Sequence, residues 1–180
     1  MLPGSPTPVF ALKNLEIGCC RFHVFDMSDQ RHLKRLAAVW EKQPVYFVTS
    51  CTAARRPLLS NATVHEILLA EWKGLRERHG WAVGRYVIMP DHVHFFIMPL
   101  SDAAKPLSSV IGKWKEWSAK QILKLSGQAA PLWQPEFFDH LVRSAESRAE
   151  KWAYVRENPV RAGLVIRAED WPFAGAVDFA

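Results

Sequence analysis

Two β-rich runs on either side of Pro90-Asp91 constrain the fold of this chain more than any other feature. Residues 81–89 and 92–98 are rich in β-branched and aromatic side chains, and the Pro-Asp pair between them favours a tight turn. We therefore expect an antiparallel hairpin at this point of the chain. The remaining elements must be compatible with that pair of strands.

Strand and helix patterns alternate on both sides of the hairpin. A β-rich run spans residues 45–51, and Asn61 can cap a helix whose apolar positions follow a 3.6-residue period. After the hairpin, Ser108 or Ser109 can cap a second helix, which Gly127 ends. Both helices are long enough to cover a sheet.

A further strand and helix complete the pattern. Residues 133–142 predict a strand interrupted at Pro135, and residues 146–158 predict a third helix, followed by Pro159. The resulting order, β-α-β-β-α-β-α, is that of a ferredoxin-like split βαβ arrangement. We expect an α+β fold with a central antiparallel sheet, helices on one face, and a C-terminal helix that carries Tyr154.

The length and composition of the chain fit one domain with an extension. The chain has 180 residues, of which 49% are hydrophobic and 23% charged, so it can bury a core and does not have a disordered composition. Prolines near the start predict an irregular segment, with one short helix at 31–40. We expect an N-terminal extension over residues 1–43 and a single domain over residues 44–180.

Several classes of protein are disfavoured by the composition. No apolar run approaches the ~20 residues of a membrane span, and the first 11 residues do not resemble a secretory signal. We therefore expect a cytoplasmic protein without a membrane partner. Cys19, Cys20 and Cys51 suggest neither a disulfide framework nor a zinc site, and we expect buried thiols. A formal charge of +5 permits a nucleic-acid partner without requiring one.

The second strand of the hairpin contains two histidines at alternate positions. His92 and His94 emerge on one face, roughly 6–7 Å apart, and can share one metal ion. Val93, Phe95 and Ile97 fall on the other face, where they can pack under the helices. The alternative is an exposed polar face that happens to contain two histidines.

Two other metal chemistries do not fit. The remaining histidines provide no second H-x-H or H-x-[ST], as a two-histidine phosphodiesterase would need, and no H-E-x-x-H helix occurs. A third ligand must come from elsewhere in the chain.

A phenol and a carboxamide lie four residues apart on the third helix. Tyr154 and Asn158 therefore share one helix face, about one turn apart. Pro159 predicts that the helix ends at Asn158 or that a new helix begins there. The alternative is a tyrosine half-buried on an amphipathic helix, with its hydroxyl in water.

Two groups of basic residues are candidates for DNA binding. A stripe with helical spacing on the second long helix consists of Lys113, Trp117, Lys120 and Lys124. This stripe could follow phosphates or be an ordinary solvated face. Arg143, Arg156 and Arg161 lie close in sequence to Tyr154 and could steer a DNA backbone.

Four motifs in order resemble those of the REP-associated tyrosine transposases, which are single-tyrosine members of the HUH endonuclease superfamily. The resemblance covers residues 45–171, and its motifs occupy residues 92–94, 132–134, 138–143 and 154–165. Residues 1–43 are not matched, and the tail at 171–175 has Ala and Gly where the family tends to have serines.

The resemblance implies a metal-dependent DNA transposase and single-strand endonuclease. Tyr154 would be the nucleophile, His92 and His94 would be metal ligands, and Asn158 would supply a third ligand. Mg²⁺ or Mn²⁺ suits such a site, although Zn²⁺ also binds imidazole. The product would be a 5′-phosphotyrosine with a free 3′-hydroxyl, which can reverse the step and join strands in DNA transposition and recombination.

The implied partner is single-stranded or hairpin DNA, such as the palindromic end of a REP element. The protein would act as a homodimer or a monomer. A domesticated single-stranded nucleic-acid-binding module that no longer cuts is the main alternative. A zinc hydrolase for small phosphoesters is a third reading, but it lacks a carboxylate ligand and leaves Tyr154 unexplained.

Overall fold

The structure is a computed structural model that describes residues 44–180. Its strands are β1 (Val45–Cys51), β2 (Trp81–Ile88), β3 (His92–Pro99), β4 (Phe138–Val142) and β5 (Ala174–Ala176). Its helices are α1 (Ala62–His79), α2 (Leu107–Ser126), α3 (Ala145–Arg156) and α4 (Asn158–Arg161), with 3-10 turns η1 (Ala53–Arg55) and η2 (Ala168–Asp170).

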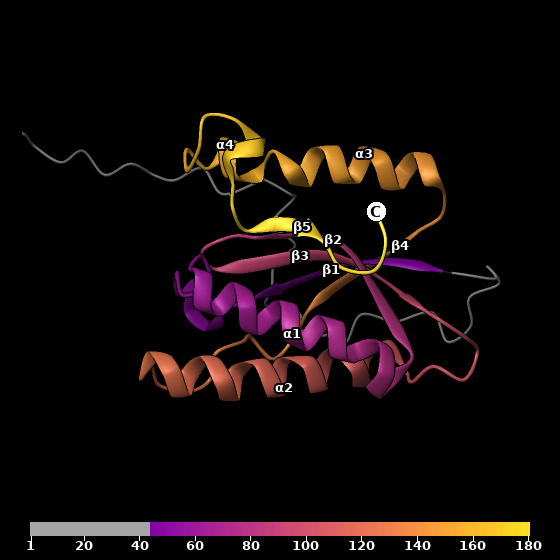
Figure 1. Cartoon of the computed structure of the whole chain (residues 1–180), viewed down its shortest axis with the longest axis horizontal. Coiled ribbons are helices and arrows are strands. Elements are labelled where there is room, and N and C mark those ends of the chain that lie inside the picture. The colour runs from indigo at the N-terminus through magenta and orange to yellow at the C-terminus, as the bar shows by residue number, and fades with distance from the viewer. Residues whose placement is uncertain (1–43) are drawn as a thin grey trace, which may run out of the picture. The chain divides into compact units, whose positions relative to one another are not determined.

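The five strands form one sheet in the order β4-β1-β3-β2-β5 (Figure 1). Every neighbouring pair is antiparallel. The β2–β3 hairpin is present, and β1 also pairs with β3. Because β3 therefore lies between β1 and β2, the unit β1-α1-β2 is a split βαβ unit. The α+β, ferredoxin-like prediction is confirmed, and β5 is an additional edge strand that the sequence pattern did not indicate.

The ends of the long helices follow local capping chemistry. The Asn61 side chain accepts a hydrogen bond from the first turn of α1, as predicted, and Gly80 ends that helix with φ 73°. The second long helix begins at Leu107, so Ser108 and Ser109 lie inside its first turn and do not cap it. The predicted start of α2 is therefore slightly too late.

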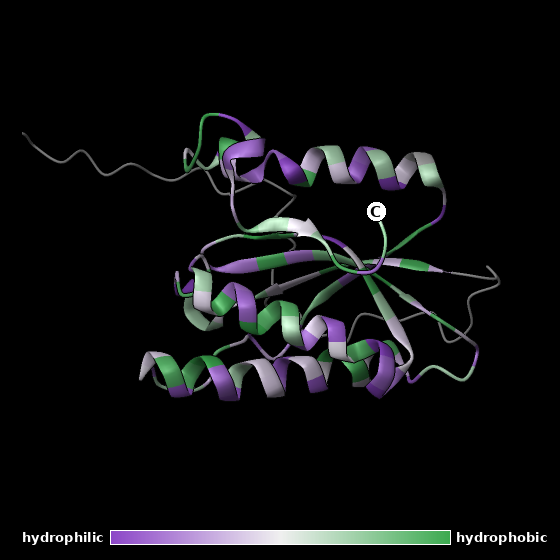
Figure 2. Ribbon diagram, viewed as in Figure 1, coloured by the Kyte–Doolittle hydropathy of each residue, from purple (hydrophilic) through white to green (hydrophobic). Residues whose placement is uncertain are grey.

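The main core lies between one face of the sheet and the helices α1 and α2 (Figure 2). Trp72 of α1 and Trp114 of α2 stack with ring centroids 5.7 Å apart. Beneath them, Val93, Phe95 and Ile97 of β3 are fully buried. The predicted division of β3 into a core side and a histidine side is confirmed.

The opposite face of the sheet carries a second, smaller apolar cluster under α3. Phe47 of β1 and Phe96 of β3 pack there with Val155 of α3, and Trp152 lies at the edge of the cluster. The helices thus occupy both faces: α1 and α2 cover one, and α3, which carries Tyr154, lies over the other (Figure 1).

The predicted strand over 133–142 is too long. Trp133 forms only an isolated bridge with Thr52, and β4 begins at residue 138. Between them, the Lys115 ammonium donates hydrogen bonds of 2.5–3.2 Å to the carbonyls of residues 134–136. Three successive carbonyls that converge on one ammonium do not have the alternating directions of an extended strand, which is consistent with the missing part of the strand.

Cys51 is half-buried and its Sγ accepts a hydrogen bond from Arg55, so the prediction of a buried thiol is wrong at this position. Cys19, Cys20 and the predicted helix at 31–40 lie outside the described residues. The division into an extension and one domain stays a prediction. Within residues 44–180, no helix has the length and apolarity needed to cross a membrane.

The stability of the fold should decrease in mild acid. The imidazole of His65 bonds the Tyr86 hydroxyl at 2.9 Å, and burial lowers the pKa of His65 below 6.5. Since the unfolded chain then binds more protons, stability is lost as the pH falls through about 6.5. We expect His65→Gln to show a smaller fall in melting temperature between pH 7.5 and 5.5 than the unaltered protein. An equal fall in both proteins would contradict this assignment.

Candidate active site

The two predicted histidines share one face of β3 and lie next to each other. The ring centroids of His92 and His94 are 4.7 Å apart, and the rings are nearly perpendicular. Phe96 continues the same face of the strand into the apolar cluster under α3. The alternation along β3 therefore places the imidazole pair on the side of the sheet that α3 overlies.

One nitrogen of each imidazole is engaged by a neighbouring side chain. His92 Nδ1 lies 2.6 Å from Asp91 Oδ1, and His94 Nδ1 lies 2.8 Å from Thr49 Oγ1. Thr49 is the residue directly opposite His94 in the pairing of β1 with β3. When Nδ1 is held in this way, the orientation of the ring is fixed and Nε2 is the nitrogen left for a metal ion.

A left-handed turn after β1 supplies a further contact to the histidine pair. Ala54 and Arg55 both have φ of 54°, a conformation that non-glycine residues seldom adopt. The turn brings Arg55 Nε to 2.7 Å from Asp91 Oδ2. Burial opposes the ionisation of Asp91, but the hydrogen bond with His92 and the charges of His92 and Arg55 outweigh it, so the pKa of Asp91 is lowered.

The surroundings of His94 favour its neutral form. Burial and the positive charges of His92, Arg55, Lys151 and Arg161 hold the pKa of His94 well below its ordinary value. His94 is therefore held in the neutral form that any histidine ligand must have.

A stack of side chains links α3 to the histidine side of the sheet. The ring of Phe47 is stacked on His94, with centroids 5.4 Å apart. On α3, the Lys151 ammonium lies 4.9 Å from the centroid of the Phe47 ring. Val155, one turn further along α3, is buried in the cluster that contains Phe47. These contacts bring the C-terminal half of α3 over the same face as the two histidines.

Tyr154 and Asn158 lie on either side of the junction between α3 and α4. Tyr154 is in the last turn of α3 and is 44% exposed, whereas Asn158 opens α4 and is only 4% exposed. Pro159 follows in the first turn of α4. Of the two outcomes predicted for this proline, the structure has the one in which a new helix begins at Asn158. An accessible phenol and a buried carboxamide therefore lie one turn apart.

Arg161 connects these two residues. Its guanidinium carbon lies 4.0 Å from the centroid of the Tyr154 ring, and its Nη2 donates to the Tyr154 carbonyl at 2.7 Å. The same nitrogen donates to Asn158 Oδ1. One planar cation thus fixes the phenol and the carboxamide relative to each other.

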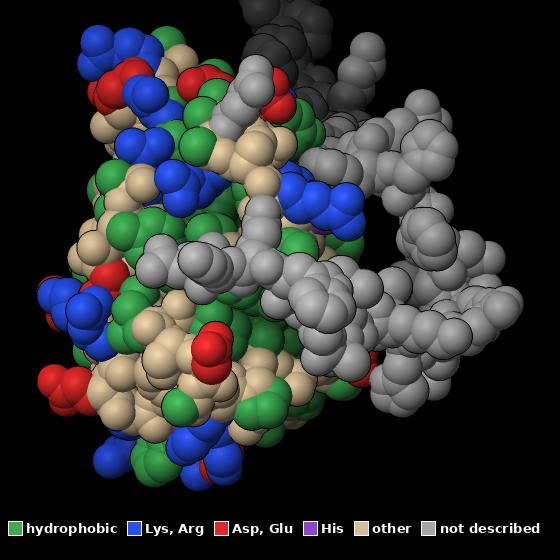
Figure 3. Space-filling view, turned by 90° about the vertical axis from the view of Figure 1, so that its right-hand side faces the viewer, with side chains coloured by type: hydrophobic (Ala, Val, Ile, Leu, Met, Phe, Trp, Pro, Cys, Tyr) green, Lys and Arg blue, Asp and Glu red, His purple; other side chains and the backbone are tan. Residues whose placement is uncertain are grey.

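The other predicted DNA-binding residues are spread over the domain. Lys113, Trp117, Lys120 and Lys124 lie on α2, across the sheet from the histidines and Tyr154. Figure 3 looks at one end of the molecule. Basic side chains lie there both near α3 and near α2, and acidic side chains lie among them.

Ion pairs reduce the net charge of the α2 stripe. Glu116 Oε2 lies 2.9 Å from Lys113 Nζ, and Glu116 Oε1 lies 2.7 Å from Lys120 Nζ. These lysines lower the pKa of Glu116 to about 2, so the carboxylate stays ionised between them. Trp117 is 50% exposed beside Lys120. A role for this stripe in DNA binding stays a prediction.

The three predicted arginines differ in their surroundings. Arg143 is exposed between β4 and α3, and Arg156 pairs with Glu169. Arg161 alone of these three has described contacts with Tyr154 and Asn158.

Sequence reasoning missed Thr49, Asp91, Arg55 and Lys151. Asp91 precedes the H-x-H motif directly, which was a signal that it could orient the first histidine. The other three approach the site only through strand register, a left-handed turn and the packing of α3. Among residues 44–180, no three or more His, Cys, Asp and Glu side chains gather as a metal site. Asn158, the predicted third ligand, is an amide and lies outside that set.

The family model described as "Transposase IS200 like" matches residues 21–158. The chain belongs to the IS200-like transposase family. The match begins within the segment that the sequence predicts as an extension.

Two known members of this kind are similar over most of their length. A REP-associated tyrosine transposase of Escherichia coli (strain K12) is 26% identical over 148 residues, which cover 82% of both chains. A solved structure of a REP-associated tyrosine transposase bound to a REP hairpin is 25% identical, with a TM-score of 0.61. The alignment covers 79% of this chain and 82% of that one. The resemblance predicted from the four motifs is confirmed.

We expect Arg161 to stabilise this IS200-like domain. Arg161→Gln removes the cation–π contact with Tyr154 and the hydrogen bond to the buried Asn158, which together should lower the free energy of unfolding by about 1–2 kcal/mol. Urea denaturation measures the change. Arg167→Gln, which breaks only an exposed pair with Asp170, is the control and should leave the free energy of unfolding nearly unchanged. Equal losses in the two variants would show that the Arg161 contacts add no stability.

Proposed function

We propose that this protein is a metal-dependent transposase that nicks single-stranded DNA and transfers the strand through a 5′-phosphotyrosine. The DNA would be the hairpin or palindromic end of a repetitive element, since the structural relative is a REP-associated transposase bound to a REP hairpin. The observation that carries the proposal is the presence, on one side of the sheet, of an anchored imidazole pair together with Tyr154 and Asn158.

The donor set fits a divalent cation. Asp91 and Thr49 hold Nδ1 of His92 and His94, and Asn158 is a buried carboxamide at the start of α4. Two Nε2 atoms and one carboxamide oxygen would hold Mg²⁺ or Mn²⁺ and leave positions for substrate oxygens. When bound, such a cation neutralises charge on the phosphodiester and so makes attack on phosphorus easier.

The chain's own residues account for the remaining steps. The Tyr154 oxygen forms a bond to phosphorus as the bond from phosphorus to the 3′-oxygen breaks, and the phenol loses its proton while the 3′-oxygen gains one. Arg161, stacked on the phenol ring, holds the nucleophile in place. Because the phosphotyrosine bond replaces the diester bond, a 3′-hydroxyl of another strand can reverse the step and join the DNA.

Asn158 Oδ1 must serve two partners in this proposal. It accepts a hydrogen bond from Arg161, and a carboxamide oxygen has a second lone pair that can bind a cation. Arg161 would then orient Asn158 as Asp91 and Thr49 orient the histidines.

The nucleophile is tested with a labelled single-stranded hairpin and Mn²⁺. We expect the unaltered protein to become covalently attached to DNA and Tyr154→Phe to form no adduct, because the benzyl ring has no oxygen to attack phosphorus. Denaturing gel electrophoresis measures the adduct, and EDTA should abolish it. An adduct of normal yield with Tyr154→Phe would mean that another residue attacks. Tight binding without an adduct under any metal would instead select the non-catalytic binding module.

The anchoring of the histidines is tested by metal affinity. Thr49→Val removes the hydroxyl bonded to His94 and should weaken Mn²⁺ binding about tenfold or more, as measured by calorimetry. Thr63→Val, at an exposed position of α1, is the matched control and should leave the affinity unchanged. Unchanged affinity in Thr49→Val would show that the Thr49 hydroxyl does not position His94 for the metal ion.

A further inference from the structure

Lys151 of α3 is a half-buried cation without a carboxylate partner. Among residues 44–180, no hydrogen bond or ion pair engages its ammonium, and burial lowers its pKa below the ordinary value of 10.5. The neighbouring cations differ, since Arg55 pairs with Asp91 and Arg161 donates to Asn158. A charge that is withdrawn from water and left unpaired is costly, which points to an anion that comes from outside these residues.

The ammonium lies close to the histidine pair. Its Nζ is 4.9 Å from the centroid of the Phe47 ring, and that ring is stacked on His94 with centroids 5.4 Å apart. Burial first, and then the charge of Lys151, hold the pKa of His140 on β4 below its ordinary value. The cation therefore lies over β1, which runs between β3 and β4 in the sheet.

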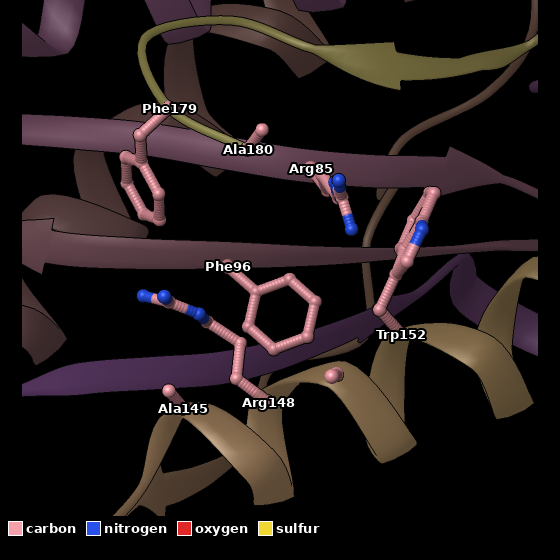
Figure 4. A pocket seen from close by; sticks show the side chains of 8 residues that line it. Arg85, Phe96, Ala145, Arg148, Trp152, Phe179 and Ala180 are labelled. Atoms are coloured by element: carbon pink, nitrogen blue, oxygen red, sulfur yellow. The ribbon is translucent and has the colours of Figure 1, made fainter.

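The packing of α3 fixes the direction in which Lys151 points. Figure 4 shows Arg148 and Trp152 reaching from α3 toward the sheet, where both line a small pocket. Val155, one turn after Lys151, is buried in the apolar cluster that contains Phe47. These contacts lie on both sides of Lys151 along the helix, so they hold α3 in one orientation and keep the ammonium over Phe47.

Lys151 precedes the candidate nucleophile by about one turn of α3. Residues three apart on a helix are neighbours on its surface, with Cβ atoms about 5–6 Å apart. After burial, positive charges lower the pKa of His94, and those of Lys151 and Arg161 are among them. Because Arg161 is stacked on Tyr154, the region between the histidines and the phenol is electropositive on both sides. A phosphodiester that reaches Tyr154 therefore also approaches Lys151.

We propose that the Lys151 ammonium binds a non-bridging oxygen of the scissile phosphodiester and stabilises the charge that accumulates there as Tyr154 attacks. The inference rests on the proposed function. The phenolate and the phosphodiester each bring one negative charge, so the transition state carries two. While the bond from phosphorus to the Tyr154 oxygen forms and the bond to the 3′-oxygen breaks, Lys151 keeps its proton and forms no covalent bond. A phosphodiester has two non-bridging oxygens, so one is left for Lys151 when a cation held by the histidines takes the other.

The first test is the single-turnover rate of adduct formation with the hairpin and Mn²⁺. Lys151→Met keeps an unbranched side chain over Phe47 but removes the charge, and it should lower this rate about 100-fold. Lys151→Arg keeps the charge and should retain about a tenth of the rate or more. Lys73→Met, at an exposed position of α1, is the matched control and should react at the unaltered rate.

Hairpin affinity separates this role from ordinary DNA binding. It is measured by fluorescence anisotropy in the Tyr154→Phe background, so that cleavage does not interfere. Adding Lys151→Met should change the affinity less than about threefold, because the charge on the bound oxygen is greatest in the transition state. A loss of affinity that accounts for the whole loss of rate would assign Lys151 to DNA binding and overturn the inference.

The second test removes the oxygen instead of the ammonium. A methylphosphonate at the scissile position replaces one non-bridging oxygen with a methyl group, and its two diastereomers are tested separately. For the diastereomer that lacks the oxygen bound by Lys151, the unaltered protein and Lys151→Met should react at rates within about threefold of each other. A variant that folds poorly would be slow on the normal diester and on both methylphosphonates, so the comparison between substrates distinguishes the two causes.

The outcomes separate this inference from the proposed function. A Lys151→Met rate within about threefold of the unaltered protein on the normal diester would overturn the inference alone, as would an equal loss on the normal diester and on both methylphosphonates. No adduct from the unaltered protein under any divalent metal would reject the nicking reaction itself, and the inference with it.

Discussion

The antiparallel pairing of β1 with β3 is the interaction on which the rest of this structure depends. Its register sets Thr49 opposite His94, and the alternation along β3 sends Phe95 to the core and His94 to the other face. A slip of one residue would put both histidines under α1 and α2 and expose the apolar side chains. The burial of Val93, Phe95 and Ile97 therefore holds the imidazole pair in place as well as stabilising the sheet.

The second requirement is that α3 crosses the histidine face. A second apolar cluster on that side of the sheet, centred on Phe47 and Phe96, gives α3 a surface on which Val155 is buried. The helix then brings Lys151 over Phe47 and continues to Tyr154, where the break before Pro159 turns Asn158 inward. Packing and candidate chemistry thus use the same few contacts, and the fold leaves the phenol accessible while it buries the carboxamide.

The sequence was sufficient to predict what depends on local periodicity. The hairpin, the Asn61 cap, the two faces of β3 and the one-turn separation of Tyr154 and Asn158 all follow from spacing within single elements. The interactions between elements were not predictable in this way. Lys115 shortens the strand before β4, the irregularity at Gly84 and Arg85 breaks the alternation of β2, and Thr49 reaches His94 only through register. The basic spacing on α2 was recognisable, but nothing local indicated that α2 lies across the sheet from Tyr154.

The central claim is that the histidine pair from the sheet and Asn158 from the helix junction hold one cation beside Tyr154. Anomalous scattering from crystals grown with Mn²⁺ and a hairpin tests it most directly. The account predicts one manganese peak about 2.0–2.3 Å from Nε2 of both histidines and from Asn158 Oδ1. A manganese bound away from the histidines, or bound by them with Asn158 out of reach, would contradict it.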